Sequence, residues 1–140
     1  MQNDVDAWLE FAERDLRAAK VMLAGEIYTH GCLYAQQVIE KALKGLILHK
    51  GKRIPKIHDL LDLLELAEEP SLAGFAEELK LINSYYLPVR YPDTLSGTGE
   101  GFEPSRRDAE SAVASAEGFL NRTINIVRPG PDASRGALRI

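Results

Sequence analysis

The stretch from Tyr34 to Lys50, YAQQVIEKALKGLILHK, decides how the rest of the chain is organised. Its apolar residues recur every three or four positions, a spacing that predicts a helix. Two neighbouring stripes follow this spacing, Ala35, Val38, Ala42 and Leu46 in one and Ile39, Leu43 and Ile47 in the other. A helix that is apolar over so wide an arc packs against neighbours on more than one side. We therefore expect this segment to be the central helix of an all-α domain.

The remaining strip of this helix is polar and carries Gln37, Glu40, Lys41 and Lys44. Glu40 precedes Lys44 by four residues, the order that favours an ion pair along a helix. One interpretation is that the strip forms the floor of a nucleotide-sized cleft. The other is that it is an ordinary solvated helix face. If Arg90 in a later loop reaches Glu40, the strip instead belongs to a structural network.

Charge is unevenly distributed along the chain, whose formal net charge is −4. Residues 41–58 contain six Lys or Arg and no acid, whereas residues 59–78 contain seven acids and no base. A basic patch beside an acidic helix pair predicts a local phosphate-facing surface rather than a general affinity for nucleic acid. From charge alone, the alternative is a solvated basic loop beside a solvated acidic face.

The length of 140 residues predicts a single domain, which we place at residues 1–127, followed by a flexible tail at residues 128–140. Helical spacing, capping residues and prolines predict five helices. Their expected ranges are 4–25, 28–51, 58–67, 70–88 and 105–127, with a loop over 89–104. At the start of the last helix, Ser105 and Asp108 match a capping box.

Composition, hydropathy and cysteine content together predict a cytoplasmic protein that does not contact membranes. The chain has the apolar and charged fractions of a soluble globular protein and no apolar run of membrane-spanning length. Its first residues lack the features of a secretory signal. Cys32 is the only cysteine, so no intrachain disulfide can form. Because His30 and Cys32 have no second ligand pair at metal spacing, we expect no metal site, and we expect no cofactor.

Four sequence features together resemble the HEPN domain family. They are the run QQVIEKALK at residues 36–44, the basic loop at residues 49–53, the start of the next helix at Ile57-His58-Asp59-Leu60-Leu61, and Arg90-Tyr91-Pro92. The resemblance covers about residues 4–127. It implies an up-and-down helical bundle of four long helices and one short helix. The alanine-rich last helix and the broad apolar surface of the first two helices lead us to expect a homodimer.

Arg53 and His58 match the spacing of the ribonuclease members of that family, which carry Arg, four to six residues, then His, and cut RNA without a metal. In that chemistry a histidine moves a proton and an arginine stabilises the charged phosphate. The sequence departs from the family pattern in two ways. Here the motif lies before the third helix, whereas in the nucleases it lies at a later helix junction. In the nucleases a tyrosine commonly follows two residues after the histidine, but here that position is Leu60. The alternative is that His58 packs at the start of a helix while Arg53 is solvated.

Arg90 and Tyr91 form the second candidate site, because they look like the family's Arg-Tyr-Pro signature. Arg90 is suited to bind a phosphate or a carboxylate through two hydrogen bonds, and Tyr91 is suited to stack on a base. In the structural alternative, Arg90 pairs with an acid such as Glu40 and attaches the loop to the central helix.

The resemblance supplies our first functional hypothesis, a non-catalytic subunit that binds a nucleotide or a protein partner. Such a subunit acts with a minimal nucleotidyltransferase in a toxin–antitoxin-like or regulatory module. Its binding site would consist of Arg90, Tyr91, Lys41, Lys44, Glu40 and Gln37. The second hypothesis is a metal-independent endoribonuclease toxin that uses Arg53 and His58. The third is a scaffold that only dimerises and recruits the transferase.

Overall fold

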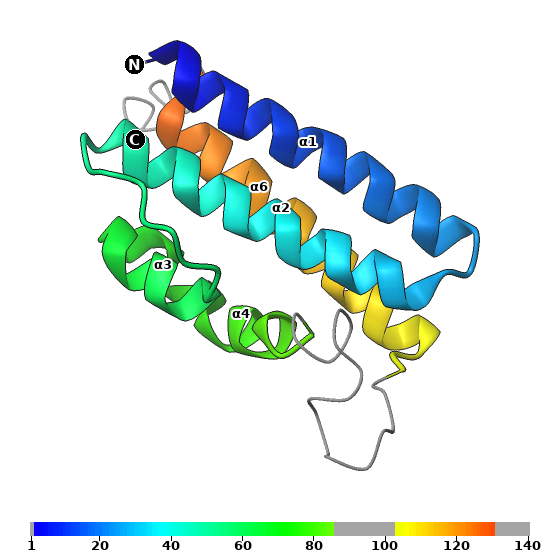
Figure 1. The fold of residues 1–140 in the computed structure, drawn as a ribbon. Helices are drawn as coiled ribbons and strands as arrows, with labels where there is room; N and C mark the ends of the chain where they lie inside the picture. The colour runs from blue at the N-terminus through cyan, green and yellow to red at the C-terminus, as the bar shows by residue number, and fades with distance from the viewer. Residues whose placement is uncertain (1, 86–102, 131–140) are drawn as a thin grey trace, which may run out of the picture.

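The computed structural model describes residues 2–85 and 103–130 of the chain, and these residues form helices and no strand. Three long helices lie side by side, α1 (Gln2–Ala24), α2 (Tyr28–His49) and α6 (Arg106–Val127) (Figure 1). Two shorter helices, α3 (Leu60–Ala67) and α4 (Ala76–Asn83), cover the other side of α2, with the 3-10 helix η1 (Pro70–Phe75) between them. The all-α helical-bundle class predicted from the sequence is confirmed.

Helix α2 is the centre of the bundle, as its two apolar stripes predict. It packs against α1 and α6 on one side and against α3 and α4 on the other. Its buried apolar residues are Cys32, Ala35, Val38, Ile39, Ala42, Leu43, Leu46 and Ile47. Because it is covered on both sides, α2 has little free surface, and its buried polar residues must find partners within the protein.

The predicted helix starts agree closely with the structure. Helix α2 begins at Tyr28, and α6 begins with the expected capping box. The Ser105 hydroxyl accepts from the Asp108 amide at 3.1 Å, and the Ser105 amide donates to the Asp108 carboxylate at 2.9 Å. Helix α3 begins two residues later than expected, because Asp59 and not His58 precedes it as the N-cap.

The helix predicted over residues 70–88 is interrupted in the structure. Residues Pro70–Phe75 form the 3-10 helix, and the α-helical part runs only from Ala76 to Asn83 within the described residues. Pro70 starts this segment, and the aromatic ring of Phe75 packs edge-on against Phe119 of α6, with ring centroids 5.2 Å apart. Packing on α6 therefore competes with continuous α-helix here. Residues 86–88, most of the predicted loop and residues 131–140 of the predicted tail lie outside the described residues.

Two further features of the described residues bear on function. None of their helices has the length and apolar character needed to cross a bilayer.

The thiol of Cys32 is buried, and desolvation raises its pKa to about 12, with a smaller contribution from Asp108. A thiol that stays protonated at neutral pH is a poor nucleophile, so Cys32 packs as an apolar residue.

Candidate functional site

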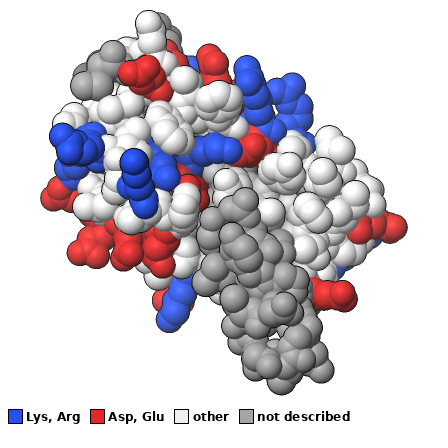
Figure 2. All heavy atoms as spheres, in the orientation of Figure 1, with Lys and Arg blue, Asp and Glu red and all other residues white. Residues whose placement is uncertain are grey.

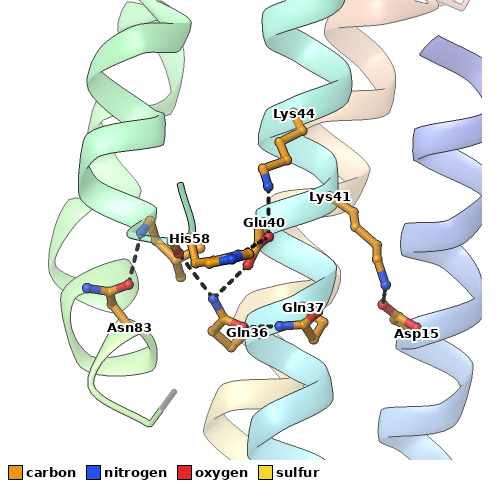
Figure 3. Close-up of polar contacts among 9 residues, drawn as sticks. Asp15, Gln36, Gln37, Glu40, Lys41, Lys44, His58 and Asn83 are labelled. Carbon is orange, nitrogen blue, oxygen red and sulfur yellow. Dashed lines mark hydrogen bonds and ion pairs between the residues drawn. The ribbon is translucent and has the colours of Figure 1, made fainter. Parts of the chain in front are cut away.

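A cluster of four polar side chains connects α2 to the segment that precedes α3 (Figure 3). Oε2 of Glu40 lies 3.0 Å from Nζ of Lys44 and 2.8 Å from Nδ1 of His58. Nε2 of Gln36 lies 3.3 Å from Oε1 of Glu40 and 3.4 Å from the carbonyl oxygen of His58. We call Gln36, Glu40, Lys44 and His58 the Glu40 cluster.

Three members of the Glu40 cluster are buried, and the fourth reaches the surface. Gln36 is fully buried, Glu40 and Lys44 are each 6% exposed, and the side chain of His58 is 56% exposed. A buried carboxylate is tolerated only when it is paired and hydrogen-bonded, and Glu40 meets both conditions. The interpretation of the strip as an ordinary solvated face is therefore wrong for Glu40 and Lys44. The predicted ion pair between them is confirmed.

The contact with Glu40 also determines how the His58 ring is presented. A carboxylate beside Nδ1 holds the imidazole in one orientation and favours the tautomer whose proton is on Nδ1. Glu40 comes from α2, whereas His58 lies 18 residues later, so this arrangement depends on the packing of α3 against α2. A histidine held in this way, with its ring half exposed, is suited to bind a phosphate or to transfer a proton.

The remaining residues of the predicted strip lie elsewhere. Lys41 forms an ion pair with Asp15 of α1, and both side chains are partly buried (Figure 3). Gln37 donates to Oε1 of Gln36 at 2.6 Å. The ammonium of Lys44 lies 5.9 Å from the centroid of the Trp8 ring, within the range of a cation–π contact. The structure thus separates Lys41, which faces α1, from Glu40, which faces the start of α3.

The lysines at the start of the basic loop are engaged by acidic residues. Lys50 pairs with Glu69 at 3.1 Å, and Lys52 pairs with Glu68 and donates to the carbonyl of Leu66 at 2.7 Å. Figure 2 shows such basic and acidic side chains close together over the end of the molecule that carries α3. These lysines attach the loop to the C-terminal end of α3, so the acidic and basic segments of the sequence largely neutralise each other here.

Arg53 and Lys56 differ from those two lysines. Both are exposed, and neither forms an ion pair with a residue that the structure describes. They lie in the same short segment as His58, which they precede by five and two residues. This segment, residues 53–58, is the part of the basic patch that still has charge to offer a ligand. Arg90 and Tyr91, the second predicted site, lie outside the described residues.

Sequence reasoning missed two partners in this region, Gln36 and Asp15. Gln36 precedes Glu40 by four residues, and that spacing could have indicated a hydrogen bond along the helix. No comparable signal marks Asp15, because it lies on another helix. Among residues 2–85 and 103–130, no three His, Cys, Asp or Glu side chains are grouped to hold a metal ion.

Comparisons with known proteins agree with the all-α fold. The family model described as HEPN domain matches residues 5–127. A Methanocaldococcus jannaschii protein named "Putative toxin MJ1304" is 24% identical over 127 aligned positions, and the match covers 81% of this chain and 81% of that protein. The crystal structure of ST0689, an archaeal HEPN homologue, covers 89% of this chain and 98% of its own with a TM-score of 0.73 and 29% identity. That of TT1696 from Thermus thermophilus covers 86% and 96% with a TM-score of 0.72 and 35% identity.

Proposed function

Because this chain belongs to the HEPN domain family, we propose that it is a toxin-like HEPN subunit that binds a phosphate-bearing ligand at residues 53–58. The ligand is a nucleotide or the backbone of an RNA, which share phosphate chemistry. Arg53 and Lys56 supply positive charge, and His58, oriented by Glu40, contributes a hydrogen bond. The role is binding, and the similarity to a protein named as a toxin supports a place in a toxin–antitoxin-like module.

The observation that carries this proposal is the difference among the cations of one loop. Lys50 and Lys52 are engaged by Glu69 and Glu68, whereas Arg53 and Lys56 are exposed and lack a carboxylate partner among the described residues. An exposed cation without a partner gives up no internal ion pair when it binds an anion. The sequence also suggested Lys41 and Lys44 as ligand residues, but each pairs with a carboxylate and so is less available.

The proposal is tested by measuring ligand binding in the presence of a chelator. Calorimetry with adenosine mono- and triphosphate and with a short single-stranded RNA distinguishes the two sources of phosphate. The variant Arg53→Ala/Lys56→Ala should bind at least about tenfold more weakly, because each hydrogen bond to a charged group contributes about 1.5–3 kcal/mol. The control Lys80→Ala/Arg122→Ala removes two exposed cations from α4 and α6 and should bind normally.

Equal weakening by both double variants would mean that binding follows net charge alone, and the proposal would fail. Arg90 belongs to the same proposal on sequence grounds, so Arg90→Ala should abolish the thermal shift that an adenine nucleotide produces. The absence of any shift or heat with all three ligands would also exclude phosphate binding.

A second function, metal-independent cleavage of RNA, is supported by the contact between His58 and Glu40. In that role His58 is the general acid or base, Glu40 is its positioning residue and Arg53 stabilises the phosphate. The expected result is RNA cleavage in chelator that is lost in His58→Ala while the fold is retained. If the wild-type protein leaves RNA intact at concentrations where binding is saturated, cleavage is excluded and only the binding role remains.

The partners in this proposal are a second copy of the chain and a minimal nucleotidyltransferase. Their support is the HEPN family and the similarity to a protein named as a toxin. Light scattering of the purified protein gives the mass in solution, and a dimer mass is expected. A monomer at micromolar concentration would contradict the homodimer. Co-purification with a co-expressed nucleotidyltransferase tests the second partner.

A further inference from the structure

Asn83, the last residue of α4, hydrogen-bonds to the start of α3 through both the oxygen and the nitrogen of its side-chain amide. Its Oδ1 accepts a hydrogen bond from the backbone amide of Leu60 at 2.9 Å, and its Nδ2 donates to Oδ2 of Asp59 at 3.1 Å. Figure 3 shows Asn83 facing the segment that carries His58, from the side opposite to α2. One side chain therefore connects the end of α4 to the start of α3, although η1 separates the two helices in the chain.

Asp59 is held from a second direction as well. Its Oδ1 accepts from the backbone amides of Leu61 and Asp62, each at 3.0 Å, and so caps α3. Both carboxylate oxygens are thus engaged, Oδ1 by the helix and Oδ2 by Asn83. With both oxygens held, the Asp59 side chain cannot rotate without breaking hydrogen bonds.

His58 lies between these hydrogen bonds and α2. Its carbonyl oxygen contacts Gln36 and its ring contacts Glu40, both on α2, while the next two residues in the chain bind Asn83 of α4. The backbone at residues 58–60 is therefore held between two helices. A change on the α4 side should therefore alter the position from which the His58 ring reaches Glu40.

We propose that Asn83 is a positioning residue for His58, acting through Asp59 and Leu60. This role rests on the proposed function only for its effect on ligand binding, since the position of the ring is measurable without a ligand. An amide is required because Asn83 must accept from Leu60 and donate to Asp59 at once. An aspartate of the same shape keeps the first hydrogen bond and loses the second.

Exchanging the two side chains provides a matched control. Asn83→Asp alone places a carboxylate against Asp59. In the double variant Asp59→Asn/Asn83→Asp, the amide introduced at position 59 donates to the carboxylate introduced at position 83, and the amide oxygen still caps α3. The exchange restores every donor–acceptor pair described above. Any defect of the single variant that comes from this contact should disappear in the double variant.

The experiment records the ring signals of the three histidines by NMR in the full chain. With Asn83→Asp the His58 signals should move, while those of His30 and His49 stay as internal references. The double variant should return His58 to its wild-type position. Ser105→Ala, which removes the cap of α6, serves as a variant that lowers stability without touching this contact.

Binding of adenosine monophosphate is the second measurement. Asn83→Asp should bind about fivefold more weakly, the effect expected from the loss of one hydrogen bond, and the double variant should recover. His58 signals that stay unchanged in Asn83→Asp, or that move equally in Ser105→Ala, would overturn the positioning role. If the wild-type protein binds no phosphate ligand, the proposed function fails and the NMR result alone decides the role of Asn83.

Discussion

Oε2 of Glu40 lies 2.8 Å from Nδ1 of His58, and it is the same oxygen that pairs with the buried ammonium of Lys44 at 3.0 Å. One carboxylate oxygen therefore serves two purposes. It neutralises a lysine inside the bundle, and it holds a histidine at the surface. Because of this double role, a substitution at Glu40 should affect both the stability of the bundle and the ligand binding that we propose for residues 53–58.

The first prediction concerns the loss of that carboxylate. Glu40→Gln leaves Lys44 charged and buried without its counterion, so the free energy of unfolding should fall by about 3–5 kcal/mol. Urea unfolding followed by circular dichroism measures the change. The double variant Glu40→Gln/Lys44→Met removes the stranded charge and should be clearly more stable than Glu40→Gln alone. If the two variants are equally unstable, burial of Lys44 is not the cause.

The second prediction compares two glycines inside long helices. A Cβ at Gly45 would lie 3.1 Å from Cβ of Trp8, an atom that cannot move without shifting α1. The overpacking cost of about 1–3 kcal/mol exceeds the gain of about 1 kcal/mol in helix propensity, so Gly45→Ala should destabilise the protein.

Gly118 is the control for this comparison. A Cβ there would lie no closer than 4.0 Å to its nearest neighbour, Cε1 of Phe75, which is an ordinary contact. Gly118→Ala should therefore stabilise α6 by about 0.5–1 kcal/mol, because only the helix propensity changes. Thermal unfolding of both variants provides the test. Changes of the same sign would contradict the close packing of Trp8 on α2.

The third prediction is a pH dependence that comes from Asp59. Its pKa lies below the usual 3.8, chiefly because the backbone amide of Asp62 donates to the carboxylate, with further lowering by Asn83 and Leu61 against the opposing effect of burial. A carboxyl group with a lowered pKa in the folded state stabilises the fold above its unfolded pKa. That contribution is lost as the pH falls through the folded pKa.

Asp59→Asn removes the titrating group and keeps a capping oxygen, but it also loses the hydrogen bond from Asn83, so only the part of the difference that changes with pH reports on the charge. The variant should be less stable than the wild type at neutral pH. The difference should narrow as the pH falls below 3.8, the unfolded pKa of Asp59, and through its lower folded pKa. Urea unfolding at a series of pH values gives both curves. A difference that stays constant down to about pH 2 would show that the charge of Asp59 does not contribute.

The fourth prediction concerns the start of α6. Ser105→Ala removes the hydroxyl that accepts from the Asp108 amide, and the loss of such a cap costs about 1 kcal/mol. Ser111 is an exposed serine inside the same helix and makes no described hydrogen bond with its side chain. Ser111→Ala should therefore be neutral or slightly stabilising. Equal losses in both variants would argue against a specific role of the cap.

Features that depend on residues a few positions apart were predicted correctly from the sequence. The start of α2 at Tyr28, the ion pair between Glu40 and Lys44, and the capping box of Ser105 and Asp108 are all confirmed. Each rests on the helical repeat or on a backbone amide within three residues. Such interactions form wherever the helix forms, so neighbouring letters of the sequence are enough to predict them.

Contacts between helices could not be predicted in the same way. The pairing of Lys41 with Asp15, of Glu40 with His58 and of Asn83 with Asp59 joins residues 18 to 26 positions apart. Which polar residues meet across two helices depends on how each helix is rotated and how far it is shifted along its neighbour. Those quantities come from the packing of many apolar side chains together, and no single motif encodes them.

The sequence by itself determined that this protein is an all-α bundle built around α2, because apolar spacing and helix ends are local properties of the chain. Only the tertiary structure decided which cations remain available. Lys50 and Lys52 are engaged by acids just after α3, Lys41 and Lys44 by acids of α1 and α2, and Arg53 and Lys56 stay exposed. The pair of Lys44 with Glu40 follows from their spacing on one helix, but the other five cations look alike in the sequence. They differ because packing brings a carboxylate from another part of the chain to Lys41, Lys50 and Lys52 and not to Arg53 or Lys56.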